Sequence, residues 1–218
     1  MKRIISGAIF DMDGTLLDSM GLWRSLPREY LRRHGIDADD EYLERELRYM
    51  AVKKAVAYLK ENYAIDTPYD EMREEIWRMM REEHYAKGVP LKPGVRELLE
   101  YLKSMGIPMA VASATRLDEV ERALKGSGIR EYFCAVVSGE TLGMHKRDPE
   151  IFEHTLSLLG TPRHTTWVIE DSCLALTTAR GAALRTVCIY DPTEPSAKEC
   201  KRVSDIYLDT FLDFGKYF

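Results

Sequence analysis

The chain has 218 residues, of which 45% are hydrophobic and 31% are charged, and this balance excludes an intrinsically disordered protein. Its net charge of -5 comes from 31 basic and 36 acidic residues without a basic tail, so we expect no nucleic-acid partner. No apolar run approaches the roughly 18 residues of a membrane-spanning helix, so we expect no membrane partner.

The segment that follows the first three residues is the first predicted strand. Residues 4–10 form a short apolar run that ends at an Asp-Gly turn signal. A signal peptide is not indicated, because Asp11 interrupts the run and no small-residue cleavage pattern follows. The four cysteines contain no CxxC pair, which favours reduced thiols and a cytoplasmic location.

The next part of the chain, residues 17–89, carries a helical pattern and no good strand. Apolar residues recur at helical spacing, with charged residues between them, over residues 22–34, 40–63 and 69–85. We therefore predict a helical insertion. Its methionines and aromatic residues are expected to form the core of this insertion rather than a cofactor site; they include Met50, Trp77, Met79 and Met80.

After the insertion, predicted strands alternate with amphipathic helices. The strands are expected at residues 108–112, 132–137, 166–169 and 186–190. Such alternation predicts an α/β fold with a doubly wound parallel sheet.

Two helices in this part of the chain have clear start and end signals. One is expected between Pro93 and Gly106, and another between Pro149 and Gly160. A weak capping-box pattern at Thr115 predicts a helix N-terminus just after the strand that ends near Ser113.

Two aspartates follow directly on the first predicted strand. Asp11 and Asp13 belong to residues 11–19, DMDGTLLDS. Ligands of open parallel sheets bind outside the carboxyl ends of the strands, where these side chains are expected. Their spacing lets both carboxylates face the same way if the chain is extended.

This segment resembles the DxDGTLxDS first motif of the haloacid dehalogenase superfamily, in its phosphatase and phosphomutase branch. The resemblance implies a Rossmann-like catalytic core made of residues 1–16 and 90–218. It also implies an all-helical cap domain of residues 17–89, inserted after the first motif.

The resemblance extends to the second predicted strand end. Ser113 is expected to bind a phosphate oxygen, together with backbone N–H groups such as that of Ala114. Arg116 is a candidate for a second phosphate or carboxylate of the substrate, although a solvated helix residue is an equally open interpretation.

The third motif of the family is matched at Lys146, which precedes a Pro-acidic-Ile-Phe helix start. Its ammonium group is expected to neutralise charge shared by the nucleophile and the phosphoryl group. The family usually has Pro directly after this lysine, where this chain has Arg147.

The fourth motif is matched at Glu170 and Asp171, and the family uses these acids to complete a magnesium site. We expect Asp171 to bind the ion directly, and Glu170 to act through water or in exchange. The family usually has Gly four residues after this Asp, where this chain has Ala175.

The predicted metal ligands are Asp11, Asp13 and Asp171. Two like charges at 4 Å repel by about 4 kcal/mol at an effective dielectric constant near 20, so the cluster needs a divalent cation. Hard oxygen ligands favour Mg²⁺, and zinc is disfavoured because no His or Cys accompanies these acids in the motifs.

The resemblance implies a two-step phosphoryl transfer. Asp11 would attack phosphorus and become an aspartyl phosphate, while Asp13 would protonate the leaving oxygen and later deprotonate water. The backbone carbonyl of Asp13 is expected on the metal, and Ser113 and Lys146 are expected to hold the transferring group.

The cap is expected to recognise the part of a small phosphorylated metabolite that is not transferred. We expect a monomer or a weak homodimer. For each candidate contact a solvated position is the alternative; the candidates are Trp23, Arg24, Arg48, Lys53 and Lys54.

Other activities remain open. A phosphomutase would use the same residues and return phosphate to the substrate. A phosphonatase would need a Schiff-base lysine, for which Lys53 or Lys54 is available, whereas a dehalogenase would lack Asp13. A non-catalytic binding module on the same fold is a further alternative.

Overall fold

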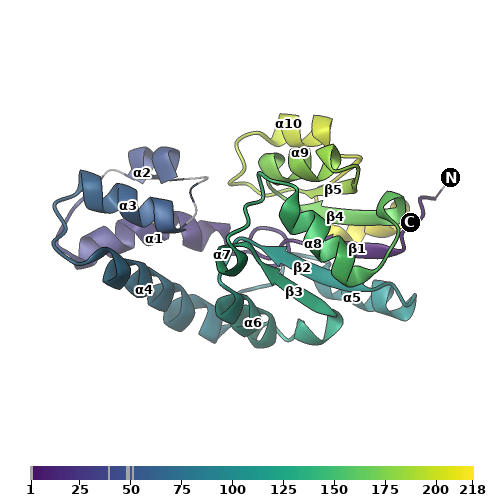
Figure 1. Cartoon of the computed structure of the whole chain (residues 1–218), viewed down its shortest axis with the longest axis horizontal. Coiled ribbons are helices and arrows are strands. Elements are labelled where there is room, and N and C mark those ends of the chain that lie inside the picture. Colours follow the sequence, from purple (N-terminus) through teal and green to yellow (C-terminus); the bar gives the residue numbers. More distant parts are fainter. Residues whose placement is uncertain (1, 39, 48–49, 51) are drawn as a thin grey trace. The chain divides into compact units, whose positions relative to one another are not determined.

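The computed structural model describes residues 2–38, 40–47, 50 and 52–218. The chain forms two compact units. The first unit contains residues 1–18 and 89–218, and the second contains residues 19–88. All strands of the described residues belong to the first unit, together with helices α5 to α10, whereas α1 to α4 belong to the second (Figure 1). The assignment of these units as catalytic core and cap stays a prediction.

The first unit is built on a sheet of six parallel strands. The strand order is β3-β2-β1-β4-β5-β6. The predicted doubly wound α/β fold is therefore confirmed, and β6 is a strand that the sequence did not indicate. The strands are β1 (Gly7–Phe10), β2 (Met109–Ser113), β3 (Ala135–Ser138), β4 (Thr166–Glu170), β5 (Arg185–Ile189) and β6 (Ile206–Leu208).

Helices join these strands. Three 3-10 helices lie at Arg130–Tyr132, Arg163–Thr165 and Phe211–Lys216. The α-helices are α5 (Val95–Ser104), α6 (Leu117–Gly126), α7 (Gly139–Leu142), α8 (Glu150–Leu159), α9 (Cys173–Gly181) and α10 (Ala197–Val203).

The predicted start and end signals are correct for α8, and the predicted N-terminus of α6 is also present shortly after Ser113, but the predicted capping box at α6 is wrong. Helix α8 begins after Pro149 and ends at Gly160, whose φ of 65° is the left-handed conformation that favours glycine. At α6 the N-cap residue is Arg116, whose side chain makes no capping hydrogen bond, and the N–H group of Leu117 donates to the hydroxyl of Thr141 at 3.2 Å. Thr115 does not complete a capping box, because its hydroxyl donates a hydrogen bond to Asp13 instead.

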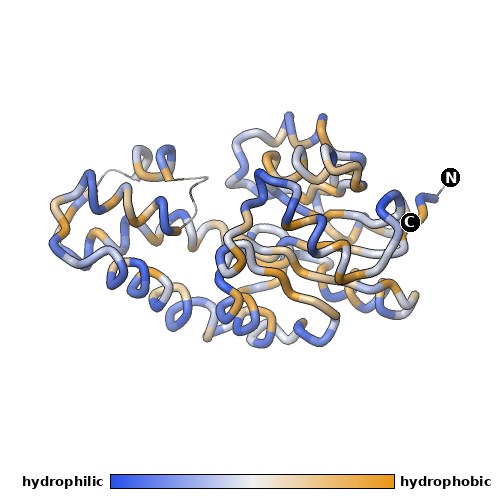
Figure 2. The backbone as a smooth tube through the Cα atoms, in the orientation of Figure 1, coloured by the Kyte–Doolittle hydropathy of each residue, from blue (hydrophilic) through white to orange (hydrophobic). Residues whose placement is uncertain are grey.

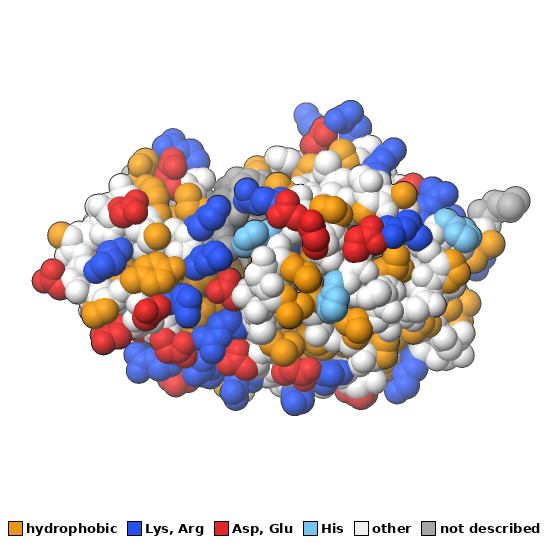
Figure 3. Space-filling model, viewed as in Figure 1, with side chains coloured by type: hydrophobic (Ala, Val, Ile, Leu, Met, Phe, Trp, Pro, Cys, Tyr) orange, Lys and Arg blue, Asp and Glu red, His pale blue; other side chains and the backbone are white. Residues whose placement is uncertain are grey.

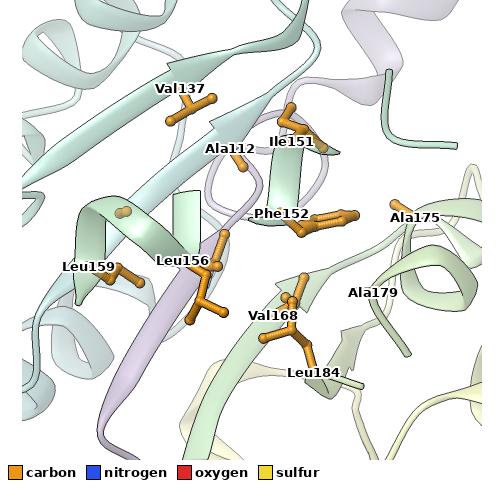
Figure 4. Close-up of a cluster of buried hydrophobic side chains, with 12 residues drawn as sticks. Ala112, Val137, Ile151, Phe152, Leu156, Leu159, Val168, Ala175, Ala179 and Leu184 are labelled. Atoms are coloured by element: carbon orange, nitrogen blue, oxygen red, sulfur yellow. The ribbon is translucent and has the colours of Figure 1, made fainter. Parts of the chain in front are cut away.

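Helices α8 and α9 cover one face of the sheet. Phe152 and Ile151 of α8 and Ala175 of α9 pack over Ala112 and Val168 (Figure 4). The strands run through hydrophobic stretches, whereas the helices alternate between hydrophobic and hydrophilic residues (Figure 2). Fully buried strands of this kind hold their carboxyl ends in a fixed arrangement, so they are a rigid support for the loops that follow them.

The second unit consists of short helices. A single helix was predicted over residues 40–63, but two are present. The unit contains α1 (Met20–Arg33), α2 (Asp40–Leu47), α3 (Val52–Asn62), α4 (Tyr69–Met79), a π-helix (Met80–His84) and a 3-10 helix (Tyr85–Lys87).

The core of the second unit contains most of the methionine and aromatic side chains predicted for it. Trp77, Met79 and Met80 are buried, and the ring of Trp23 meets Trp77 edge to face at 5.5 Å. The prediction is wrong for Met50, which is 36% exposed. Met50 follows α2 rather than lying within a continuous helix, so the helical spacing that placed it in the core does not apply.

The two segments that lead to and from the second unit are paired within the first unit. Leu17 forms an antiparallel bridge with Leu91. The N–H group of Asp18 donates to the oxygen of Pro90 at 2.9 Å, and that of Lys92 donates to the oxygen of Leu16 at 3.0 Å. Both ends of the insertion are thus fixed beside each other in the first unit.

Basic and acidic side chains are interspersed over the face shown in Figure 3. None of the helices in the described part of the chain has the length and apolar character needed to span a bilayer.

Candidate active site

Three carboxylates meet where two neighbouring strands end. Asp11 directly follows β1, Glu170 is the last residue of β4, and Asp171 comes next. Strands β1 and β4 are paired, and the N–H group of Asp11 donates to the oxygen of Ile169 at 3.0 Å. Each carboxylate contributes an oxygen, and the three oxygens all lie within 4.8 Å of one another. All three side chains are buried.

Lys146 joins this acidic group from the loop before α8. Its ammonium group forms an ion pair with Asp11 and another with Glu170, the latter at 2.7 Å. The lysine side chain is only 11% exposed. Burial lowers the pKa of Lys146, but the charges of Asp11 and Glu170 outweigh this effect, so the net shift of the pKa is upward. The lysine is therefore held in its charged form.

The single positive charge of Lys146 does not balance the three acids. Burial, and next the charge of Glu170, raise the pKa of Asp11 to about 7, although Lys146 acts in the opposite direction. Burial and the charges of Glu170 and Asp11 also raise the pKa of Asp171. The fully ionised cluster is thus unfavourable with these residues alone, and a further cation would stabilise it.

The residues fit a hard divalent cation. Among the described residues, the group formed by Asp11, Glu170 and Asp171 is the one whose His, Cys, Asp or Glu ligand atoms lie close enough to hold a metal ion. All of its donors are carboxylate oxygens, which suit Mg²⁺ and not the softer metals that prefer nitrogen or sulfur.

Glu170 has hydrogen-bond partners on both carboxylate oxygens. Oε1 accepts from Lys146, while Oε2 accepts from the backbone N–H groups of Asp171 at 2.7 Å and Ser172 at 2.9 Å. Glu170 therefore holds Lys146 and the backbone that follows β4, and its predicted indirect action on a metal ion stays a prediction. Asp171 accepts a 2.7 Å hydrogen bond on Oδ1 from the hydroxyl of Thr15.

Asp13 is not one of these three carboxylates, although its charge also raises the pKa of Asp11, and it is tied to the end of β2. Its Oδ2 accepts a 2.8 Å hydrogen bond from the hydroxyl of Thr115. The N–H group of Thr115 in turn donates to the hydroxyl of Ser113, the buried last residue of β2, at 3.1 Å. Asp13 and Ser113, both predicted site residues, are thereby linked through Thr115. We had expected the Asp13 carboxylate to converge with those of Asp11 and Asp171, but the group that meets contains Glu170 in its place. The metal contact predicted for Asp13, which includes its backbone carbonyl, stays a prediction.

The other predicted substrate contacts, Ala114 and Arg116, are not part of the acidic group. Ala114 is exposed between Ser113 and Thr115. Arg116 donates hydrogen bonds of 3.2 and 3.1 Å to the two carboxylate oxygens of Asp118 on α6. The roles proposed for Ala114 and Arg116 therefore stay predictions.

The candidate cap contacts also stay predictions. Trp23, Arg24, Lys53 and Lys54 belong to the second unit, and Arg48 lies outside the described residues.

No site role was predicted for Thr15, and Thr115 was predicted to cap a helix. The two departures from the family pattern, Arg147 and Ala175, had no structural account. Thr15 is part of the DxDGTLxDS segment, which was the available signal, whereas an isolated Thr115 gives none. Ala175 fills a place in the core beneath α8, so the side chain that replaces glycine is accommodated by packing. Arg147 is exposed beside Lys146, which is partly buried.

Comparisons with known proteins relate the chain to one family of enzymes. The family model of haloacid dehalogenase-like hydrolases matches residues 8–189. Protein CbbY of Cereibacter sphaeroides is 30% identical, with 97% of this chain and 95% of the relative covered. Hexitol phosphatase B of Escherichia coli (strain K12) is 27% identical, with 87% and 86% covered.

The same relationship holds among solved structures. A crystal structure of a CbbY mutant from Rhodobacter sphaeroides in complex with xylulose-(1,5)bisphosphate has a TM-score of 0.81 and 26% identity, and 97% of each chain is covered. Because the family model spans most of the sequence and the fold agrees along almost its full length, the chain belongs to the haloacid dehalogenase-like hydrolase family, in its phosphatase branch, as predicted.

Proposed function

We propose that the chain is a phosphatase that hydrolyses the phosphate ester of a small phosphorylated sugar or a related metabolite, with Asp11 as the nucleophile. The observation that carries this proposal is the contact of Lys146 with Asp11 inside a buried group of three carboxylates. A nucleophilic carboxylate held beside a largely enclosed cation at the carboxyl ends of parallel strands suits attack on a phosphoryl group.

The first chemical step belongs to Asp11. Its carboxylate attacks phosphorus, the bond to the leaving oxygen breaks, and an aspartyl phosphate is formed. Lys146 neutralises charge on Asp11 and on the phosphoryl oxygens, while the hydroxyl of Ser113 donates to a phosphoryl oxygen. Because Lys146 already contacts Asp11, little rearrangement of these two side chains is needed before attack.

The proton transfers belong to Asp13. It gives a proton to the leaving oxygen in the first step and takes one from the attacking water in the second. The hydrogen bond from Thr115 fixes the orientation of its carboxylate. This bond also ties Asp13 to the end of β2, where Ser113 lies, so the acid-base group and the phosphate-binding hydroxyl are held in one arrangement.

Asp11 and Asp171 would hold Mg²⁺ through their side chains, and Asp13 through its backbone carbonyl. When bound, the ion would neutralise charge on the carboxylates and on the phosphoryl group. Thr15 orients Asp171, and Glu170 orients Lys146 and the backbone around Asp171. Burial and the charge of Glu170 raise the pKa of Asp11, so a bound cation would favour the ionised form that attacks phosphorus.

The names of the relatives support a sugar phosphate as the substrate. They include a hexitol phosphatase and a phosphorylated carbohydrates phosphatase, and the CbbY structure contains a ketopentose bisphosphate. We therefore propose a small phosphorylated carbohydrate over a nucleotide. The cytoplasmic location inferred from the sequence stays a prediction.

A panel of phosphorylated compounds tests the proposal. It contains hexitol phosphates, hexose phosphates, ketopentose bisphosphates, phosphoglycolate and nucleoside monophosphates, each incubated with Mg²⁺ or with EDTA while phosphate release is followed. We expect release from one of the sugar phosphates with Mg²⁺ and none with EDTA. No release from any compound contradicts the proposal, and isomer formation without release would identify a phosphomutase.

A further inference from the structure

Ser138 is the buried last residue of β3, outside the motifs recognised in the sequence. Strands β2 and β3 are parallel, and Ser138 lies beside Ser113 in their register. Because the carboxyl ends of parallel strands meet at one edge of a sheet, the loops that follow these two serines are neighbours at the edge where the candidate active site lies.

The hydroxyl of Ser138 is bonded to the loop that follows β2. It donates a 2.7 Å hydrogen bond, in a buried position, to the backbone oxygen of Thr115. The hydroxyl of the same threonine donates to Oδ2 of Asp13 at 2.8 Å, and its N–H group donates to the hydroxyl of Ser113 at 3.1 Å. Ser138 thus holds the backbone of the residue whose side chain holds Asp13.

A second contact fixes the same loop. Helix α7 follows Ser138 directly, and the hydroxyl of Thr141 in α7 accepts a 3.2 Å hydrogen bond from the N–H group of Leu117, the first residue of α6. The N–H group of Thr141 in turn donates to the hydroxyl of Ser138 at 3.1 Å. The short loop between β2 and α6 is therefore bonded to the end of β3 at Thr115 and to α7 at Leu117.

We propose that Ser138 is a positioning residue for the acid-base group Asp13 and acts through Thr115, an inference that rests on the proposed function. Ser138 fixes the backbone of Thr115, and thereby the hydroxyl that orients the Asp13 carboxylate. A general acid must lie within about 2.6–3.2 Å of the atom to which it gives its proton, so a small displacement of Asp13 weakens the proton transfer.

The alternative is that Ser138 only caps α7. Its hydroxyl accepts from the N–H group of Thr141, as an N-cap side chain does. A cap alone would affect stability and would change the reaction of every substrate to the same degree. The bond that Ser138 donates to Thr115 is not needed for a cap, so the two roles differ in what the loss of the hydroxyl does to different substrates.

The leaving group of the substrate reports whether Asp13 is in place. The alkoxide of a sugar needs a proton from the general acid in order to leave, whereas p-nitrophenolate is stable enough to leave without one. The ratio kcat/KM covers the steps up to the aspartyl phosphate, so the later attack of water does not enter it. A loss of kcat/KM confined to the sugar phosphate therefore indicates a displaced Asp13.

The experiment measures kcat/KM with Mg²⁺ for p-nitrophenyl phosphate and for the sugar phosphate that the wild type hydrolyses best. Ser138→Ala should lower the value for the sugar phosphate about tenfold, which is a part of the roughly 10²- to 10⁴-fold that general acid–base catalysis contributes. The value for p-nitrophenyl phosphate should change by less than about twofold. Ser138→Thr keeps a hydroxyl and should restore most of the loss.

A double-mutant cycle tests whether Ser138 acts through Thr115. Thr115→Val removes the hydroxyl that donates to Asp13 and should cause the same selective loss. In the Thr115→Val background, Ser138→Ala should cause little further loss with the sugar phosphate, because the link to Asp13 is already broken. Losses that simply multiply in the double variant would overturn the action through Thr115.

Thr166→Val is the matched control. Thr166 is also a buried strand residue whose hydroxyl donates to a backbone oxygen, that of Pro162 at 2.8 Å, but it begins β4 and so lies at the opposite end of the strands. Thermal denaturation should show losses of stability of similar size in Thr166→Val and Ser138→Ala. The control should keep the wild-type kcat/KM for both substrates.

Equal losses for the two substrates in Ser138→Ala, no loss for either, or no recovery in Ser138→Thr would overturn the positioning role, while the proposed phosphatase would stand. A wild type that releases phosphate from neither kind of substrate would overturn the proposed function, and the role of Ser138 with it.

Discussion

The ammonium group of Lys92 lies 2.7 Å from Oδ2 of Asp191, and both side chains are buried. Lys92 also donates to the backbone oxygen of Tyr190 at 2.9 Å. The backbone N–H group of the same lysine donates to Leu16, in the loop that carries the DxDGTLxDS segment. The pair therefore joins this loop to the chain that follows β5, although 99 residues separate its two members.

Substitution of Lys92 by Met should destabilise the protein strongly. The change leaves the Asp191 carboxylate buried without its partner, and loss of one member of a buried ion pair costs about 3–5 kcal/mol. Urea denaturation measures the change in the free energy of unfolding. The matched control is Lys216→Met, which removes an exposed pair with Asp213 and should cost no more than about 1 kcal/mol. Equal losses in the two variants would contradict the expected role of Lys92.

The same pair predicts how stability depends on pH. Burial acts to raise the pKa of Asp191, but hydrogen bonds from Lys92 and Thr193 and the charge of Lys92 hold it below its ordinary value of 3.8. A carboxylate with a depressed pKa in the folded state stabilises fully above its unfolded pKa, and this contribution disappears as pH falls through the folded pKa. Urea denaturation from about pH 6 to pH 3 should show this loss in the wild type. Lys92→Met should lack it, and parallel pH profiles would refute the assignment.

Substitution of Asp11 by Asn should abolish turnover while the fold is kept. An amide cannot attack phosphorus, and loss of a nucleophile lowers kcat by more than about 10⁴-fold. Phosphate release with the best substrate of the panel measures the effect, and circular dichroism checks the fold. Asp209→Asn is the matched control, because Asp209 is exposed beyond β6 and should keep wild-type turnover. Turnover at ordinary rates in the Asp11 variant would exclude it as the nucleophile.

Magnesium should stabilise the folded protein in the absence of any substrate. A ligand at 100 times its Kd raises the free energy of unfolding by about 2.7 kcal/mol, so the midpoint of thermal denaturation should rise with Mg²⁺ over EDTA. Asp171→Asn removes one predicted ligand and should reduce this rise, whereas Asp209→Asn should keep it. If Mg²⁺ has no effect on the wild-type midpoint, the acidic group does not bind the ion in the free enzyme.

Substitution of Lys146 by Met should affect both stability and turnover. It leaves Asp11 and Glu170 buried side by side without the cation that they share, at a cost of about 3 kcal/mol. Turnover should fall by about 10²- to 10³-fold because the phosphoryl charge loses a stabilising partner. Mg²⁺ should restore more stability to this variant than to the wild type.

The control for Lys146 is Lys125→Met, which removes a surface pair with Glu121 and should change stability by less than about 1 kcal/mol. Thermal denaturation and phosphate release are measured on both variants. Similar stability of the two variants without Mg²⁺ would show that the acids do not depend on Lys146 for charge balance.

The alternation of apolar runs and helical segments was sufficient to predict the parallel sheet, because buried strands such as β2 and β4 have a strong apolar signal. Strand β6 was missed since it has only three residues and one of them, Tyr207, is half-exposed. The break between α2 and α3 was not predicted. Apolar residues continue at helical spacing past the end of α2, and no Gly or Pro marks the break.

The candidate site was predictable where a motif spans consecutive residues, as at Asp11 and Asp171. Contacts between distant side chains had no such signal. Thr115 was predicted to cap a helix, but its hydroxyl donates a hydrogen bond to Asp13. The ion pair between Lys92 and Asp191 joins two segments that no sequence motif connects. Such contacts are decided by how strands are ordered in the sheet, which the sequence pattern leaves undetermined.

The paired backbone at Leu17 and Leu91 has a consequence for how this protein can diversify. Because the outgoing and returning segments are hydrogen-bonded to each other, the distance between the two attachment points is independent of what lies between them. A loop or domain of another length can be exchanged at this junction without changing the spacing of β1 and its neighbours. Insertions of different length can therefore enter and leave the first unit at this junction while the carboxyl end of β1 keeps its position.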